Sequence, residues 1–299
     1  MIKKLDEIVE KVKSISSMKL AVAAAQDKEV LQAIFDAKKK GIIDPILIGD
    51  VEKITEIAKI LEEDIDNIKL IQGDDLKDCA QKAVKLVSSG EADFLMKGLL
   101  DTSILLKEVL NKEYGLRTDS LLSHVMVYEV LSYHKLLLLT DGGMNIAPDV
   151  NQKVKIINNA VKVAKSLDIK EVKVACIAAK EKVSEKMIAT VDAKELSENN
   201  YGENVIVEGP LAFDLAVSKE AAKIKKFESR VSGDVDIILV PTIEVGNGIG
   251  KSLTYMANAK SAGIIMGAKA PVVLVSRADT HESKLYSIAL GALIASSKK

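Results

Sequence analysis

Short apolar runs alternate with amphipathic segments along nearly the whole chain. The apolar runs lack the in-and-out alternation of half-exposed strands, which indicates a parallel sheet covered by helices on both faces. Strands and helices in strict alternation predict an α/β fold with right-handed crossovers. In the first part of the chain the predicted strands are 20–25, 45–49, 68–73 and 94–96, and the predicted helices are 27–40, 51–62, 74–89 and 102–112.

The rhythm changes around residues 123–141. Two strand-like runs, 124–130 and 136–140, follow one another quickly, and the turn Asp141-Gly142-Gly143 comes after them. A second α/β series then begins, so we predict a domain junction near residues 125–140. Its predicted helices are 152–166, 184–196 and 211–225, and its predicted strands are 172–178, 205–208 and 235–240.

Length and composition limit the class of protein. At ~150 residues per domain, 299 residues suggest about two domains, and a hydrophobic fraction of 48% excludes wholesale disorder. The net charge of −1 gives no broad basic surface, so we expect neither nucleic acid nor membrane as a partner. The apolar stretches are shorter than the ~20 residues that span a bilayer, and the N-terminus lacks a signal-peptide core. We expect a soluble, cytoplasmic protein.

A glycine-rich segment at 244–252 is the first candidate site. Gly246, Gly248 and Gly250 would let the backbone approach a ligand, and the N–H groups of a following helix, predicted to run to about residue 262, would favour an anion. The P-loop spacing fails because position 245 is Val, and the dinucleotide-binding spacing fails because position 251 is Lys. The alternative is a flexible helix cap that binds nothing.

A second candidate is the segment 267–282, which ends a buried strand in a cluster of polar groups. Ser276 and Arg277 would lie beyond the carboxyl end of this strand, where open α/β sheets bind ligands, and an Arg there suits bidentate binding of phosphate. The alternative is that Ser276 or Thr280 caps the last helix, with Asp279 or Glu282 complementing its dipole.

Other polar positions are less specific. Lys97 and Gly98 end another strand, where Lys97 is either a phosphate ligand or a surface lysine. The turns at 141–145 and 208–214 are, each alone, more typical of turns than of sites. The spacing of the histidines and of the two distant cysteines argues against a zinc site. We therefore expect no metal.

Five segments, taken together and in order, resemble the phosphate acetyl/butyryl transferase family, with the strongest likeness to its butyryl-transferring members. Any one segment alone is weak evidence, whereas the ordered set covers nearly the whole chain. The segments are 96–100, 141–146, 208–214, 240–247 and 267–271 running into 276–279.

The resemblance implies two three-layer α/β/α domains similar to the isocitrate/isopropylmalate dehydrogenases, with the active site in the interdomain cleft. Residues 1–125 with 277–299 would form the first domain and residues 126–276 the second. The implied reaction is reversible transfer of a short acyl group, butanoyl, between coenzyme A and inorganic phosphate. Coenzyme A is then a substrate, no metal or redox cofactor is required, and we expect a homo-oligomer.

The resemblance also implies roles for named residues. Ser276 would donate a hydrogen bond to the developing oxyanion and Arg277 would hold phosphate. Ser283 stands where the acetyltransferases have an Asp, so Asp279 is the favoured general base, ahead of Glu282. Lys107 stands where they have an Arg, which implies a role in binding a coenzyme A phosphate. The expected substrate-binding residues are Lys97, Gly98, Thr102, Lys107, Asn247, Gly248, Gly250, Lys251 and Lys269.

Three alternatives stay open. A member of the same family could prefer acetyl, since one methylene changes discrimination by only ~1–3 kcal/mol. A metal-dependent hydroxyacid dehydrogenase of the same fold would need an arginine cluster, and the chain has only Arg117, Arg230 and Arg277. A protein that binds coenzyme A or phosphate without catalysis is the third.

Overall fold

The computed structural model describes residues 1–275 and 279–297 and confirms the predicted α/β class. The chain forms two compact units. One consists of Met1–Leu5 and Leu121–Ser261, and the other of Asp6–Ser120 and Ala262–Lys299. We call the first the inserted unit, because most of it lies between the two segments of the second, and we call the second the split unit.

The sheet of the split unit is mainly parallel. In it β1 pairs with β2 and β4, and β4 pairs with β11, all in parallel, while β10 runs antiparallel to β11. Strand β1 is buried throughout except at Lys19, as expected for a strand covered on both faces. In sheet order the strands are β3 (Lys69–Gln72), β2 (Ile43–Gly49), β1 (Met18–Ala23), β4 (Phe94–Lys97), β11 (Val272–Val273) and β10 (Lys260–Met266).

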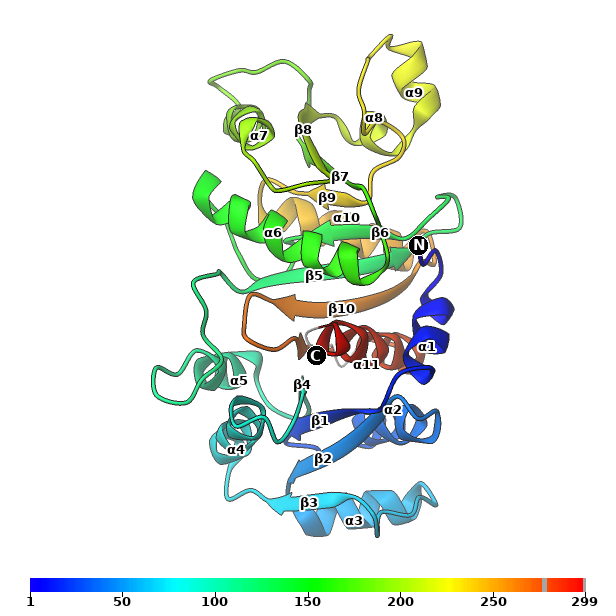
Figure 1. Cartoon of the computed structure of the whole chain (residues 1–299), viewed down its shortest axis with the longest axis vertical. Coiled ribbons are helices and arrows are strands. Elements are labelled where there is room, and N and C mark those ends of the chain that lie inside the picture. Colours follow the sequence, from blue (N-terminus) through cyan, green and yellow to red (C-terminus); the bar gives the residue numbers. More distant parts are fainter. Residues whose placement is uncertain (276–278, 298–299) are drawn as a thin grey trace. The chain divides into compact units, whose positions relative to one another are not determined.

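Helices cover both faces of this sheet, with α2, α3 and α11 packed on one face and α4 and α5 on the other (Figure 1). Asp27, Asp50 and Asp75 start α2, α3 and α4, since each carboxylate accepts the backbone N–H three residues ahead. The helices are α1 (Leu5–Lys13), α2 (Lys28–Lys39), α3 (Val51–Ile60), α4 (Leu76–Ser88), α5 (Thr102–Val109) and α11 (His281–Ser296).

The inserted unit contains a second group of paired strands. An antiparallel hairpin, β5 with β6, accounts for the two strand-like runs in quick succession, and β9, β7 and β8 continue the sheet in parallel. One face carries a buried cluster that includes Tyr128, Leu139 and Ile238 and packs against Ile249 and Leu253 of α10. In sheet order the strands are β5 (Ser123–Glu129), β6 (Leu137–Thr140), β9 (Ile237–Leu239), β7 (Val172–Ile177) and β8 (Val205–Leu211).

Helices α6 and α7 lie together on the opposite face of this sheet from α10 (Figure 1). Asp149 starts α6 with a capping box, in which its carboxylate accepts from the Gln152 N–H and the Gln152 side chain accepts from the Asp149 N–H. The helices of this unit are α6 (Val150–Ser166), α7 (Ile188–Glu198), α8 (Phe213–Val217), α9 (Lys219–Ile224) and α10 (Ile243–Tyr255).

Two predicted helices are wrong in extent. The segment 211–225 is not one helix but the end of β8 followed by α8 and α9, because Ser218 leaves the helical conformation and its hydroxyl caps α9 at the Ala221 N–H. The helix expected to end near residue 262 ends at Tyr255, and residues 260–266 form the buried strand β10. The run Ala262–Met266 is short and apolar, so periodicity alone could not distinguish its strand from a buried helix.

None of the helices in the described residues is both long enough and apolar enough to cross a membrane.

Candidate active site

The strand order of the split unit reverses between β1 and β4. The chain moves from β1 outward to β2 and β3, then returns through α4 to add β4 on the other side of β1. Right-handed crossovers therefore place α2 and α4 on opposite faces of the sheet. Connections that leave neighbouring strand ends toward opposite faces open a crevice, and ligands of open α/β sheets bind there.

A cavity of about 200 Å³ lies at this reversal. Residues that follow β1 form one part of its wall, and residues that follow β4 form another. Val275, which comes shortly after β11, contributes as well. Its lining residues are Asp27, Glu29, Val30, Lys97, Gly98, Leu99, Val275 and Lys284.

Gly98 lets the two connections approach each other. A Cβ atom there would lie 2.2 Å from the Ala24 carbonyl oxygen and 2.8 Å from that of Ala23. The close approach is held by the N–H groups of Gly98 and Leu99, which donate to Ala23 and Ala24 at 2.8 and 2.7 Å. Ala24 has a φ of +55°, an uncommon conformation for a residue with a side chain. The wall of the cavity is thus built from tightly packed backbone.

Two ammonium groups line the cavity. Lys97 ends β4, and its Nζ donates to the carbonyls of Gly98 and Leu100 at 3.2 and 3.1 Å. Lys284 comes from the first turn of α11, is only 2% exposed, and donates to the Glu29 carboxylate at 2.9 Å and to the Asp279 carbonyl at 2.7 Å. Hydrogen bonding and charge from Lys284 lower the pKa of Glu29. Asp27 and Glu29 line the same cavity, so its two ammonium groups are balanced by two carboxylates, of which Glu29 is paired with Lys284.

The structure places some predicted site residues near this cavity. Lys97 and Gly98 line it, and the Asp279 carbonyl bonds to Lys284, which also lines it. Thr102 starts α5 and Lys107 lies in its last turn, both exposed. Ser276 and Arg277 lie outside the described residues. Lys269 is exposed, and its backbone N–H donates to the Leu116 carbonyl at 2.8 Å.

The glycine-rich segment is not a loop. Residues 244–252 lie within α10, whose first turn begins at Ile243, ahead of the glycines, and the Ile243 N–H donates to the Ile146 carbonyl at 2.9 Å. Gly246 and Gly250, one turn apart, allow close packing: a Cβ would lie 2.6 Å from the Gly142 Cα at Gly246 and 2.7 Å from the Tyr128 hydroxyl at Gly250. The expectation that the glycines precede the helix is wrong, because they lie within α10 and two of them allow it to pack closely.

Three predicted residues lie on the exposed side of α10 in the inserted unit. Asn247 and Gly248 are exposed, and nothing lies within 4 Å of a Cβ placed at Gly248. Lys251 is exposed too, and its Nζ lies 5.7 Å from the centre of the Tyr255 ring.

The turn after β6 is organised by the buried carboxylate of Asp141. One oxygen accepts from the N–H groups of Gly143 and Met144 at 2.9 and 3.0 Å. The other accepts from the His124 N–H at 3.2 Å and the Asn145 amide at 2.6 Å. The carboxylate is thereby fully engaged in holding the turn, which agrees with the expectation that 141–145 is a turn.

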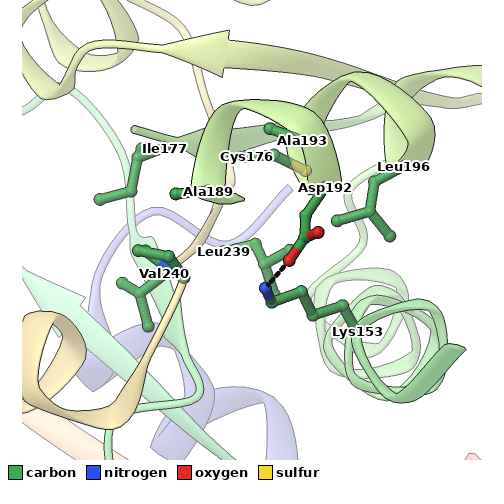
Figure 2. Close-up of a pocket in the computed structure, with 10 residues that line it drawn as sticks. Lys153, Cys176, Ile177, Ala189, Asp192, Ala193, Leu196, Leu239 and Val240 are labelled. Atoms are coloured by element: carbon green, nitrogen blue, oxygen red, sulfur yellow. Dashed lines mark hydrogen bonds and ion pairs between the residues drawn. The ribbon is translucent and has the colours of Figure 1, made fainter. Parts of the chain in front are cut away.

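A much smaller cavity, about 10 Å³, lies in the inserted unit between α6, α7 and the ends of β7 and β9. Figure 2 shows the ion pair that dominates it, in which Lys153 donates to the Asp192 carboxylate at 2.5 Å. Cys176 also lines it, and burial raises the pKa of its thiol to about 12, so the thiol stays protonated. The cavity has room for one water at most.

Within residues 1–275 and 279–297, no three His, Cys, Asp or Glu side chains gather where they could hold a metal ion.

Sequence inspection missed the contributions of Asp27, Glu29 and Lys284 to the cavity. Asp27 carries a detectable signal, because a carboxylate that caps the helix after a strand marks the strand's carboxyl end. Lys284 carries no such signal, because its partner Glu29 lies 255 positions away in the chain.

The family model described as Phosphate acetyl/butaryl transferase matches residues 73–292. This range includes Lys97 and Lys284 of the split unit and nearly all of the inserted unit. The chain belongs to this family, and the resemblance noted in its sequence is confirmed.

Individual relatives agree. The chain is 48% identical to phosphate butyryltransferase of Clostridium acetobutylicum over the full length of both, and 42% identical to phosphate acetyltransferase of Thermotoga maritima over 97% of this chain and 99% of that one. Among solved structures, a branched-chain phosphotransacylase from Enterococcus faecalis V583 superposes with a TM-score of 0.85 at 37% identity, covering 93% of this chain and 99% of that one.

A more distant likeness confirms the dehydrogenase-like fold. The 4-hydroxythreonine-4-phosphate dehydrogenase from Klebsiella pneumoniae superposes with a TM-score of 0.53 over 94% of this chain and all of that one, at 12% identity. At this identity the likeness concerns the fold alone.

Proposed function

We propose that this acyltransferase has phosphate butyryltransferase activity, the reversible transfer of butanoyl between coenzyme A and inorganic phosphate. A phosphate oxygen forms the new bond to the thioester carbonyl carbon, the carbon–sulfur bond breaks, and free coenzyme A leaves with the displaced electron pair. The products are butanoyl phosphate and the thiol. The 48% identity to a phosphate butyryltransferase along the whole chain supports butanoyl as the acyl group.

The observation that carries the proposal is the cavity at the β1–β4 reversal. It places the Lys97 ammonium at the carboxyl end of the parallel strand β4, where positive charge would help to hold an anionic substrate. Phosphate, acyl phosphate and the phosphates of coenzyme A are all anions of this kind.

We assign roles to residues as the family resemblance implies. Ser276 stabilises the oxyanion and Arg277 holds phosphate, while Asp279 is the general base that takes the thiol proton in the reverse direction. Lys97, Gly98, Thr102, Lys107 and Lys269 contribute to substrate binding from the split unit, and the exposed face of α10 contributes Asn247, Gly248 and Lys251. Gly250 supports that face from within α10, since its own position is buried.

The proposal includes conditions of action. The enzyme needs no metal or redox cofactor, acts in the cytoplasm in butanoate metabolism, and assembles as a homo-oligomer. Its partners are acyl-CoA and inorganic phosphate, with no nucleic acid and no membrane.

The direct test is release of free thiol from acyl-CoA in the presence of phosphate, using acyl chains of two to six carbons. We expect kcat/KM to be highest for butanoyl and unchanged by a chelator. A maximum at acetyl would favour the acetyltransferase alternative that the Thermotoga maritima relative represents. A strict requirement for a divalent cation or NAD would contradict the proposal.

Ser276→Ala and Thr280→Ala together separate catalysis from helix capping, because the Thr280 hydroxyl is the group that caps α11, accepting from the Ser283 N–H at 3.1 Å. Loss of an oxyanion donor lowers kcat by ~10²–10³ with little change in stability, whereas loss of a cap lowers the free energy of unfolding by ~1 kcal/mol with normal turnover. Turnover and the thermal midpoint are measured on the same preparation of each variant. Near-parental kcat in Ser276→Ala would contradict the assignment.

A further inference from the structure

We propose that Lys284 is a positioning residue of this enzyme, whose buried ammonium fixes the main chain at Asp279 beside the cavity. The inference rests on the proposed function, because it concerns the candidate base of acyl transfer. Nothing in the sequence pattern marks Lys284 for this role, since it occupies the first turn of an apolar helix.

The location of Lys284 is unfavourable for a cation on two counts. The side chain is 2% exposed, and removing an ammonium from water is costly unless it is paired and hydrogen-bonded. It also lies in the first turn of α11, where the helix dipole favours negative charge. Hydrogen bonds or ion pairs of Lys284 must therefore compensate for both the loss of hydration and the unfavourable helix dipole.

The ion pair with Glu29 is not enough to explain this location. The Glu29 carboxylate is 69% exposed, and ion pairs with one partner in solvent contribute little to stability. The shorter contact is the one to the Asp279 carbonyl, at 2.7 Å against 2.9 Å for Glu29. A hydrogen bond from a charged donor is about twice as strong as a neutral one, and this one ends on the main chain.

Among the described residues, the other buried lysines, Lys135 and Lys153, differ from Lys284 in that each is paired with a carboxylate that is itself mostly buried. Lys153 is 5% exposed and pairs with Asp192, which is 15% exposed, so that both partners lie inside the protein. Lys135 pairs with buried Asp236, and it also donates to the Asp234 carbonyl at 2.9 Å. In both pairs one buried charge compensates another between elements of the inserted unit. Lys284, at the start of α11, instead donates to an exposed carboxylate and to a loop carbonyl, and it lines a cavity.

The consequence for catalysis is geometric. Fixing the Asp279 carbonyl restricts where its carboxylate, the candidate base, can lie relative to the cavity that Lys284 lines. Catalysis depends steeply on such placement, and a displacement of about 1 Å can lower the rate by about 10²-fold. Lys284 acts through Asp279, and we assign it no contact with the substrate.

The experiment compares Lys284→Met with Lys153→Met in the full-length protein. Each variant removes one buried ammonium and keeps an unbranched apolar side chain. For Lys284→Met we expect kcat to fall by about 10-fold or more, with both KM values within about twofold of the parent. We expect Lys153→Met to lose stability but keep the parental kcat. Amide hydrogen exchange of Asp279–Ser283 should accelerate in Lys284→Met alone.

Glu29→Gln distinguishes the two partners of Lys284, because it removes the carboxylate and keeps the contact with the carbonyl. We expect its kcat to remain within about twofold of the parent, since an exposed ion pair contributes little. If Lys284→Met does not fold, Lys284→Gln, whose nitrogen is one atom closer to the backbone and uncharged, replaces it with the same expected outcome.

Three results would overturn the inference. Parental kcat and exchange in the Lys284 variant would show a structural role only. A rise in the KM for phosphate alone would make Lys284 a direct ligand, and a fall in kcat in Glu29→Gln equal to that in Lys284→Met would place the effect in the ion pair. If the parent itself transfers no acyl group, the proposed function fails, and the hydrogen-exchange comparison still decides whether Lys284 holds Asp279.

Discussion

The two units of the chain use polar groups at their strand ends in different ways. In the inserted unit, Asp141 ends β6 with all its acceptor capacity used by neighbouring N–H groups, and the cavity nearby holds one water at most. In the split unit, Lys97 and Lys284 surround a cavity about twenty times larger by volume. Both edges look alike as sequence, with a polar residue and a glycine after an apolar run. The contacts in the structure distinguish the two edges: the one at Asp141 stabilises a turn, and the one at Lys97 borders a cavity that could bind a ligand.

The largest effect that we expect comes from Asp141→Asn. Both carboxylate oxygens of Asp141 accept hydrogen bonds, whereas the NH₂ group of an Asn side chain can only donate. One oxygen's donors would therefore lose their acceptor and remain buried and unpaired. The free energy of unfolding should fall by about 3 kcal/mol, as measured by urea denaturation. The control is Glu203→Gln, an exposed carboxylate in the same unit, which should stay within about 0.5 kcal/mol of the parent. Equal, small changes in both would show that the Asp141 turn is not a structural centre.

The counterpart in the split unit is Lys97→Met. We expect kcat/KM for phosphate to fall by about 10²-fold, because a fixed positive charge at the cavity is lost. The free energy of unfolding should change by less than about 1 kcal/mol, since the methionine preserves most of the side chain's packing. Kinetics and urea denaturation on the same variant check both parts. Loss of stability without loss of activity would reverse the contrast between the units.

Acid sensitivity provides a third contrast. Burial raises the pKa of Asp234, but hydrogen bonds from Lys173, His134 and Lys135 outweigh it and hold this pKa well below the usual range. A carboxyl whose pKa is lowered on folding stabilises the protein above its unfolded-state pKa of about 3.9 and loses this contribution as the pH falls.

Asp234→Asn should therefore lower the free energy of unfolding by about 2 kcal/mol at pH 7, with the difference from the parent shrinking below about pH 4. Urea denaturation across this pH range measures the difference directly. A difference independent of pH would show that the carboxylate charge is not responsible.

The smallest expected effect is at Gly248, on the exposed side of α10. An added Cβ meets nothing within 4 Å, so Gly248→Ala should stabilise the protein by about 0.8 kcal/mol through helix propensity. Gly250→Ala is the opposite case, because its Cβ would lie 2.7 Å from the Tyr128 hydroxyl. Thermal denaturation should move the two variants in opposite directions. A fall in activity of Gly248→Ala, despite its higher stability, would support a role in substrate binding.

The sequence predicts the elements well where a single local signal dominates. Strand 20–25 was expected and β1 occupies Met18–Ala23, and helix 27–40 was expected where Asp27 caps α2 at Lys28–Lys39. Local signals of this kind, an apolar run and a capping carboxylate, are complete within a few residues.

The predictions are wrong or incomplete where the role of a residue depends on another residue far away in the sequence. Gly246 looks like a loop residue until Gly142 is known to lie against it. Lys284 contacts Glu29, 255 positions away in the chain, so no local pattern could have placed it at the cavity. Of the predicted site residues, Lys97 and Gly98 at the end of β4 line the cavity, whereas the helix residues Glu29 and Lys284, which also line it, were not predicted.

The interrupted course of the split unit has a consequence for how the protein forms as it is made. Strand β4 must wait for its neighbour β11, and α2 for its neighbour α11, until the whole inserted unit has left the ribosome. At 5–20 residues per second, about 140 intervening residues impose a delay on the order of 10 s. During that time the apolar side of α2 and the open edge of β4 are exposed. Nascent chains of this protein should therefore engage chaperones through residues 20–110, while residues 121–261 can already be compact.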